Sequence, residues 1–294
     1  MAEARLALRP TTAEPATMLA LLIVAGLAAL VCAGPVLLAW LGLDGNSVDL
    51  LARLEPPSSA HPLGTDDLGR DVLARLIQGG RVSLAVGLAG ALLAAAIGTG
   101  IGLVAGYLGG IVDALLMRLT DLVISLPLLP LLIVLAAVDL GKLGLPAQGE
   151  LAGVVRIVVL MALFGWTTTA RLVRASVLSL RTREFVRAAQ AMGAGPGRIL
   201  VRHILPNAAG PLIVATTLSI GNVILVESVL SFLGLGVQPP VASWGNMLTG
   251  AQELLFEAPR LALWPGALIF LSVLAFNLLG DGLQSYLDPR RLRR

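Results

Sequence analysis

Residues 183–206, REFVRAAQAMGAGPGRILVRHILP, form a polar island between long apolar runs of a 294-residue chain. Seven arginines but only one acid, Glu184, lie in the segment from Arg171 to Arg202. So many uncompensated charges are unstable in hydrocarbon, and we therefore expect this island to lie in water.

The island itself divides into two helices. Three apolar residues at helical spacing predict a stripe along the first helix: Phe185, Ala189 and Met192. The glycine-rich segment 193–197 then breaks that helix, and residues 198–205 are expected to form a second helix that ends at Pro206. Residues 184–206 are therefore predicted to form a compact helical unit outside the bilayer, called the knob below.

The rest of the chain is too apolar for a soluble domain, since 56% of all residues are hydrophobic and 13% are charged. A helix needs roughly 20 apolar residues to cross a bilayer. Six stretches approach or exceed that length: 18–41, 82–108, 114–138, 151–170, 208–235 and 261–279. Because backbone amides in lipid need internal partners, the spans must be helices. The predicted fold class is all-α, a polytopic membrane protein with six transmembrane helices.

The basic residues predict the orientation. With both termini in the cytoplasm, 14 lysines and arginines fall on the inside and 6 on the outside, and Arg156 lies within a span. The chain then divides into a cytoplasmic lead 1–17, a first span 18–41, an external segment 42–81, a five-helix core 82–282 with a cytoplasmic loop 171–207, and a basic tail 283–294. These basic residues are not interleaved with aromatic residues, so no nucleic-acid partner is expected.

Few residues of this chain could support catalysis or bind a cofactor. One cysteine, Cys32, and two histidines in opposite aqueous segments, His61 and His203, predict neither a metal site nor a nucleophile paired with a base. The single lysine, Lys142, is not part of a phosphate-binding G-x-x-x-x-G-K-[ST] loop. We therefore expect no cofactor on this chain and no enzymatic activity. An ion-coupled carrier is the alternative, although no clear internal repeat supports it.

The external segment is predicted to end in an amphipathic helix at the outer surface. Thr65 or Asp66 would cap this helix, and Gly79-Gly80 would end it. In the next span, small residues recur at every fourth position: Gly90, Ala94, Gly98, Gly102, Gly106 and Gly110. They predict close packing within the chain or, alternatively, a seam to a partner. Pro127 and Pro130 predict a kink in the third span.

Two polar residues stand out in the fifth span, Asn222 and Glu227. A carboxylate inside a membrane is unfavourable unless it is paired or in contact with water, so Glu227 is a functional candidate. It could line a translocation path together with Asn222. It could equally bond to a neighbouring helix and serve only packing.

Within the knob, Ala188-Ala189 is followed by Gly193 four residues after the second alanine, and then by Leu205-Pro206. This pattern resembles the EAA loop of bacterial ABC importer permeases. Arg187 stands where that family usually has Glu, and Glu184 lies one turn earlier. The resemblance implies that the knob docks into a groove on a separate ATPase subunit. A basic loop that only fixes topology is the alternative.

The external segment carries a second pattern: His61, Gly64, Thr65, Asp66, Gly69, Arg70 and Asp71. It looks like a hallmark of the C-type permease of peptide and nickel importers, and segments 231–247 and 275–290 also resemble that family. Together these matches extend over most of the chain.

The resemblance implies a type I importer permease in the bacterial cytoplasmic (inner) membrane, in contact with lipid. Its expected partners are a second, homologous permease in a heterodimer, two ATPase subunits that bind ATP and Mg, and an extracytoplasmic solute-binding protein. The implied activity is import of di- and oligopeptides by alternating access, with nickel, glutathione or another small solute as alternative cargo.

The orientation predicts which side of the membrane each loop faces. Cysteines introduced at Ser59 and Gln252 should react with an impermeant thiol reagent added outside intact cells. A cysteine at Gln190 should react only after the cells are opened. External labelling at Gln190 would reverse the orientation.

Overall fold

The computed structural model describes residues 15–138 and 152–287. The predicted tail 283–294 and the turn after the third span therefore lie largely outside the described residues. The described helices are α1 (Pro15–Leu41), α2 (Val72–Leu108), α3 (Gly110–Ser125), α4 (Leu128–Ala136), α5 (Ala152–Leu180), α6 (Glu184–Ala191), α7 (Pro196–Ile199), α8 (Leu205–Phe232), α9 (Trp244–Glu253) and α10 (Arg260–Leu287). Five of them, including α8 with the turns before it, are long and apolar enough to cross a membrane, and α3 with α4 makes a sixth candidate. The all-α fold is confirmed, with five apolar spans, or six if α3 and α4 together form one.

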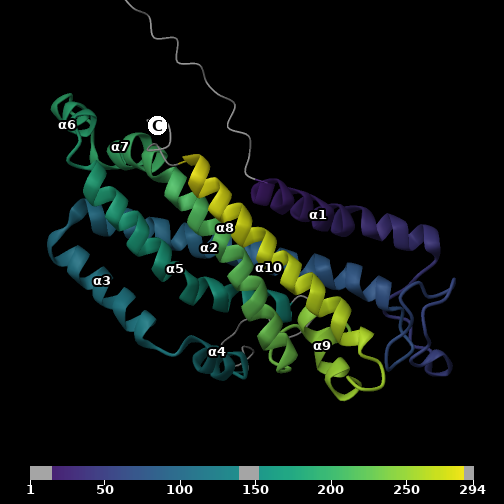
Figure 1. The fold of residues 1–294 in the computed structure, drawn as a ribbon. Coiled ribbons are helices and arrows are strands. Elements are labelled where there is room, and N and C mark those ends of the chain that lie inside the picture. Colours follow the sequence, from purple (N-terminus) through teal and green to yellow (C-terminus); the bar gives the residue numbers. More distant parts are fainter. Residues whose placement is uncertain (1–14, 139–151, 288–294) are drawn as a thin grey trace, which may run out of the picture.

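Helix α2 runs through the middle of the bundle and packs against α1, α5 and α8, while α10 lies along α8 (Figure 1). One end of the bundle carries α6 and α7 and is called the α6 end. The beginning of α1 and the end of α10 meet there, because a Cβ on Gly282 would lie 2.3 Å from Thr17 Oγ1. The opposite end, the α9 end, carries α9 and residues 42–71 (Figure 1).

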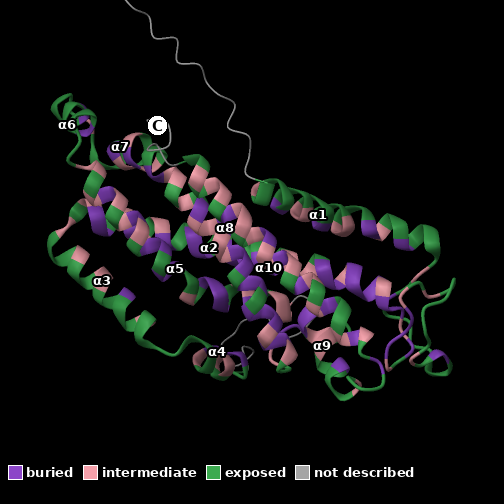
Figure 2. Cartoon of the chain, in the orientation of Figure 1, coloured by how far each residue is buried: buried purple, intermediate pink, exposed green. Residues whose placement is uncertain are grey.

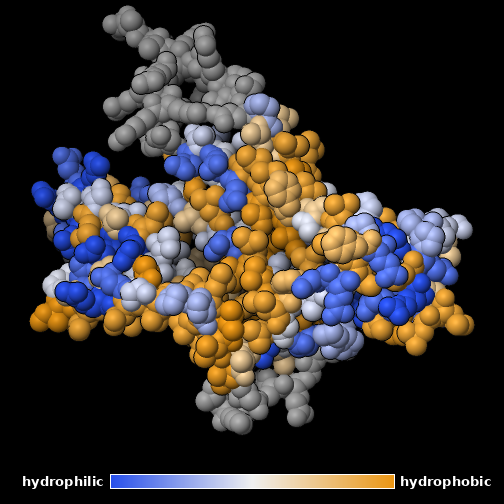
Figure 3. All heavy atoms as spheres, turned by 60° about the horizontal axis from the view of Figure 1, so that its bottom comes forward, coloured by the Kyte–Doolittle hydropathy of each residue, from blue (hydrophilic) through white to orange (hydrophobic). Residues whose placement is uncertain are grey.

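The outside of the bundle is apolar between two polar ends. Helices α1 and α3 are largely exposed, whereas buried residues concentrate on α2, α5 and α8 (Figure 2). In Figure 3, hydrophobic residues cover the middle of the viewed face, and hydrophilic residues gather on both sides of it. Such a surface suits a bilayer, which solvates the apolar middle and leaves the charged ends in water.

The predicted boundary between an amphipathic helix and the second span is wrong. A single helix, α2, begins at Val72 with Asp71 as its N-cap and continues to Leu108. Gly79 and Gly80 do not end it, because α9 packs directly onto them. A Cβ on Gly79 would lie 3.1 Å from the carbonyl carbon of Ser243, and the contact offsets the roughly 1 kcal/mol by which glycine disfavours a helix.

The small residues of α2 pack within the chain, as the first alternative predicted. A Cβ on Gly98 would lie 2.4 Å from the carbonyl oxygen of Trp166, and one on Gly102 would lie 2.6 Å from that of Ala170. Helix α5 therefore rests on the backbone of α2, and the seam to a partner is wrong for these two positions.

The kink predicted in the third span is confirmed at Pro127, and it is sharper than a kink within one helix. Pro130 lies in the first turn of α4, which continues past it. Helices α3 and α4 meet at 84°. Leu126 is extended (φ −78°, ψ 136°), as expected before a proline, and Pro127 becomes the N-cap of α4.

Two glycines of α2 should respond oppositely to alanine. Gly102→Ala should destabilise the protein by about 1–3 kcal/mol, because its Cβ meets backbone that cannot move away. Gly100→Ala should be neutral or raise stability by up to about 1 kcal/mol, since nothing lies within 4 Å of its Cβ. Thermal melting in detergent measures both, and equal melting temperatures would contradict the packing described for α2.

Candidate functional site

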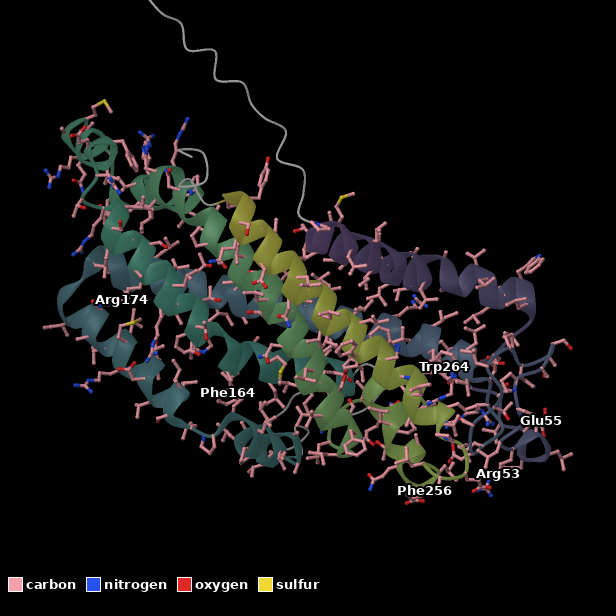
Figure 4. The ribbon with its side chains drawn as sticks, in the orientation of Figure 1. Arg53, Glu55, Phe164, Arg174, Phe256 and Trp264 are labelled. Atoms are coloured by element: carbon pink, nitrogen blue, oxygen red, sulfur yellow. The ribbon has the colours of Figure 1, made fainter. Side chains whose placement is uncertain are left out.

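The predicted cytoplasmic loop begins as a helix, because α5 continues ten residues past the predicted end of its span, to Leu180. Two arginines of this extension bind α3. Arg174, which Figure 4 labels on this extension, donates to both carboxylate oxygens of Asp113, with N–O distances of 2.5 and 2.7 Å. Arg171 pairs with Asp121 at 2.5 Å. A two-point contact of this kind fixes the direction of an arginine side chain, so the base of the knob is held in place.

The knob has its own apolar core. Val186 of α6, Ile199 of α7 and Ile204 are at most 1% exposed, and they pack against Val173 and Val177 of α5. Burial of this size contributes roughly 1.5–3 kcal/mol for each large side chain and holds the knob on α5.

The predicted apolar stripe of the first knob helix is therefore only partly right. Ala189 is 2% exposed, but Phe185 is 41% and Met192 is 81% exposed. Val186 and Ala189, three residues apart, form the inward face instead, since α6 turns that side toward the core.

The turn predicted at Gly193 is present. Gly193 has φ +82°, a conformation that glycine adopts without strain. The amide of Gly193 donates to the carbonyl of Gln190 (2.9 Å), and that of Ala194 donates to the carbonyl of Ala189 (3.0 Å). These two bonds form a Schellman motif, which ends α6 and returns the chain toward α7.

The predicted helix end at Pro206 is wrong. Residues Leu200–Ile204 form a π-helical segment that leads directly into α8, and the amide of Leu205 donates to the carbonyl of Leu200. Pro206 lies in the first turn of α8, where a missing N–H is tolerated. The helical path is continuous from α7 to Phe232, so the knob and the fifth span are joined without a flexible linker.

The predicted coupling residues point in different directions. Glu184, Arg187, Ala188 and Pro206 are exposed, Leu205 is half-buried, and Ala189 faces the core of the knob. Ala188 is therefore a small residue on the surface of the knob, while Ala189 and Gly193 shape the knob itself.

The external pattern folds into a cap on the beginning of α2. Asp66 accepts bonds from the amides of Leu68 and Arg70 (both 2.9 Å) and from Arg70 Nε (2.8 Å). Asp71 accepts from the amide of Ala74 (2.8 Å), while its other oxygen lies 3.0 Å from His61 Nδ1. Asp71 thus satisfies one of the free amides at the start of the helix, while Asp66 holds the loop before it.

Glycines and a threonine close this cap. Gly64 and Gly69 have φ +78° and +72°, and a Cβ on Gly69 would lie 1.6 Å from the carbonyl oxygen of Asp49. The hydroxyl of Thr65 donates to the carbonyl of Ala52 and accepts from the amide of Glu55. The structure brings all seven residues of the pattern together, and these contacts are internal to the chain.

The structure does not bring Glu227 and Asn222 together. Glu227 is 0% exposed and accepts hydrogen bonds from the hydroxyls of Ser83 (3.0 Å) and Ser231 (2.7 Å). The hydroxyl of Ser228 lies 3.4 Å from the carboxylate and donates to the carbonyl of Ile224 at 2.8 Å. Asn222 lies on an exposed face of α8. In this conformation Glu227 is enclosed by neighbouring helices, as the packing alternative requires, and the translocation path stays a prediction.

The sequence alone did not identify the hydroxyl groups that bind Glu227. Ser83 lies 144 residues from Glu227, and nothing in its own span marks it as a partner. The spacing of Ser231, four residues after Glu227, was a usable local signal, because such residues share one helix face. Among residues 15–138 and 152–287, no group of three or more potential metal ligands occurs.

Comparisons with known proteins agree with this architecture. Residues 98–293 match the family described as binding-protein-dependent transport system inner membrane component. A putative peptide permease protein of Brucella suis is 44% identical over 253 residues, which are 85% of this chain and 80% of that protein. The nickel transport system permease protein NikC of Escherichia coli is 41% identical over 250 residues (85% and 86%), and the oligopeptide transport system permease protein OppC of Bacillus subtilis is 38% identical over 247 (84% and 77%).

Two neighbouring aspartates of the cap should differ in their effect on stability. Asp71→Ala should lower the free energy of unfolding by about 1–2 kcal/mol, because α2 loses its N-cap and a buried carboxylate. Asp67→Ala should change it by less than about 0.5 kcal/mol. Asp67 is half-exposed, and its ion pair with Arg70 is long at 3.7 Å and therefore weak. Thermal melting compares the two, and an Asp67 variant that is the less stable would refute the capping role.

Proposed function

The chain belongs to the family of binding-protein-dependent transport system inner membrane components, and we propose that it forms one half of the membrane path of a peptide importer. It is a multi-pass permease subunit of a bacterial ABC importer in the inner membrane. Members of this family work with ATPase subunits and a solute-binding protein. The names of two similar permeases favour peptides as cargo, while the nickel permease keeps a metal complex or another small solute as the alternative.

The observation that carries the coupling proposal is the rigid attachment of the knob to α8. Helix α6 stands at the tip, and α7 continues through the π-helical segment into the fifth span. A push on α6 therefore moves a transmembrane helix rather than a loop. We place Ala188 at the ATPase contact, because it is exposed beside Phe185 and carries no bulk that would hold a partner away.

The proposed assembly is supported by the family and by the distribution of basic residues. The α6 end faces the cytoplasm, where its arginines favour retention. Two ATPase subunits bind ATP and Mg there, and this chain itself binds no cofactor and catalyses no reaction.

A second, related permease completes the path as a heterodimer. Asn222 lies on an exposed face of α8 and could line that path. The solute-binding protein delivers cargo at the α9 end, and ATP-driven movement of α8 alternates access between the two sides.

Reconstitution tests this function directly. The chain is purified with its second permease and ATPases, placed in liposomes, and supplied with binding protein and a labelled dipeptide or oligopeptide. Uptake should require ATP and the binding protein. Uptake driven by a proton gradient without ATP would instead support an ion-coupled carrier, and uptake of nickel or glutathione but not peptide would change the cargo.

A bulky residue at Ala188 should uncouple the complex. Ala188→Trp should reduce ATP-dependent uptake at least tenfold with an unchanged melting temperature, since the side chain points outward and disturbs only docking. Gln190→Trp is the control, an exposed position two residues further along α6 and on another face. Equal uptake by the two variants would count against docking through Ala188.

A further inference from the structure

The carboxylate of Glu227 lies where three helices meet. It projects from α8, and its Oε2 accepts from Ser83 of α2 while its Oε1 accepts from Ser231 of α8. A fully buried carboxylate needs such donors, because the loss of one leaves charge without solvation. We call Glu227 and the three serines beside it, Ser83, Ser228 and Ser231, the carboxylate cage.

One hydroxyl of this cage also holds α9. Ser83 Oγ donates to Glu227 and accepts from the amide of Trp244, the first residue of α9, at 3.2 Å. Trp244 is 0% exposed, and its Nε1 donates to the carbonyl of Leu76 at 3.0 Å. A chain of hydrogen bonds thus runs from α8 through α2 into α9.

There is little free space around this chain of bonds. A Cβ on Gly245 would lie 2.6 Å from the Cα of Ser228, and one on Gly80 would lie 2.8 Å from the ring of Trp244. Thr249 adds a bond from α9 to the carbonyl of Phe232 at 3.0 Å. Tightly packed groups of this kind transmit displacement because they have no room to absorb it.

The same helix carries the knob at its other end. Glu227 lies 22 residues after Leu205, or about 33 Å along a helix that rises 1.5 Å per residue. Pro206 and Pro211 lie in the first two turns of this stretch, and no proline lies between Pro211 and Glu227. A displacement of the knob therefore arrives at the cage through one continuous helix.

We propose that Glu227 is the positioning residue through which movement of α8 at the knob reaches α9 at the opposite end. The proposal rests on the coupling role of the knob and extends it across the membrane. Ser83 is the junction, since it bonds α8 and α9 at once. In this role Glu227 acts through its hydrogen bonds and makes no contact with cargo.

The structure supplies a matched pair of serines for the test. Ser83 and Ser272 are both 0% exposed, but Ser272 bonds only the carbonyl of Leu268 on its own helix. Ser83→Ala removes the junction, and Ser272→Ala removes an equally buried hydroxyl without crossing between helices. A general loss of stability would affect both variants alike.

The first measurement needs only the isolated chain. Hydrogen exchange of the amides of residues 244–253 should become at least tenfold faster in Ser83→Ala and less than twofold faster in Ser272→Ala. Equal exchange in the two variants overturns the proposal, whether or not the chain imports peptide.

The second measurement uses the reconstituted complex and counts cargo molecules taken up per ATP hydrolysed. Ser83→Ala and Glu227→Leu should lower this ratio at least fivefold. Ser272→Ala should change it less than twofold, and Glu227→Gln, which keeps an acceptor for Ser83, should retain at least half of it.

Two results would overturn the proposal here. One is a Ser83→Ala variant that takes up as much cargo per ATP hydrolysed as the wild type. The other is a Gln variant that loses uptake while α9 keeps its wild-type exchange, because the charge itself would then act on cargo. Absence of ATP-dependent uptake in the wild type would refute the proposed function alone. The exchange experiment would still test whether the carboxylate cage holds α9.

Discussion

The close approach of α2 to its neighbours is the contact on which the rest of the structure depends. Helices in lipid gain little from burying apolar surface against each other, so they associate through packing and backbone proximity. Glycines supply that proximity on three sides of α2: Gly98 and Gly102 against α5, Gly87 against α8, and Gly79 against the start of α9. Because α5 leads to the knob and α9 belongs to the opposite end, the position of α2 fixes both polar ends relative to one another.

Charged residues complete this arrangement only where water or a fixed partner is available. At the α6 end, Arg174 is held by Asp113, and at the α9 end, Arg70 is held by Asp66. Between them Glu227 is the one carboxylate with 0% exposure among the described residues, and hydroxyl groups rather than a cation surround it. A cage of hydroxyls solvates the carboxylate without introducing a second buried charge, whose desolvation would be a further penalty.

Sequence reasoning succeeded where the signal is local and failed where it depends on packing. Length and composition were enough to locate the apolar spans, and Pro127 was enough for the break between α3 and α4. Gly79-Gly80 and Pro206 gave the opposite result, because a glycine continues a helix when a neighbour needs the space and a proline is tolerated in a first turn. The bond from Ser83 to Glu227 joins distant parts of the chain and leaves no periodic trace in either span.

The residues that mark the family divide by what they touch, and this division limits what a motif match says about function. In the knob, Ala188 is exposed on the surface, whereas Ala189 and Gly193 shape the element that presents it. In the cap, Asp66 and Asp71 bind backbone amides of their own segment, and Gly69 makes room for Asp49. The cap pattern is therefore explained by the folding of the α9 end, and the proposed contact with cargo falls to exposed side chains of the bundle such as Asn222.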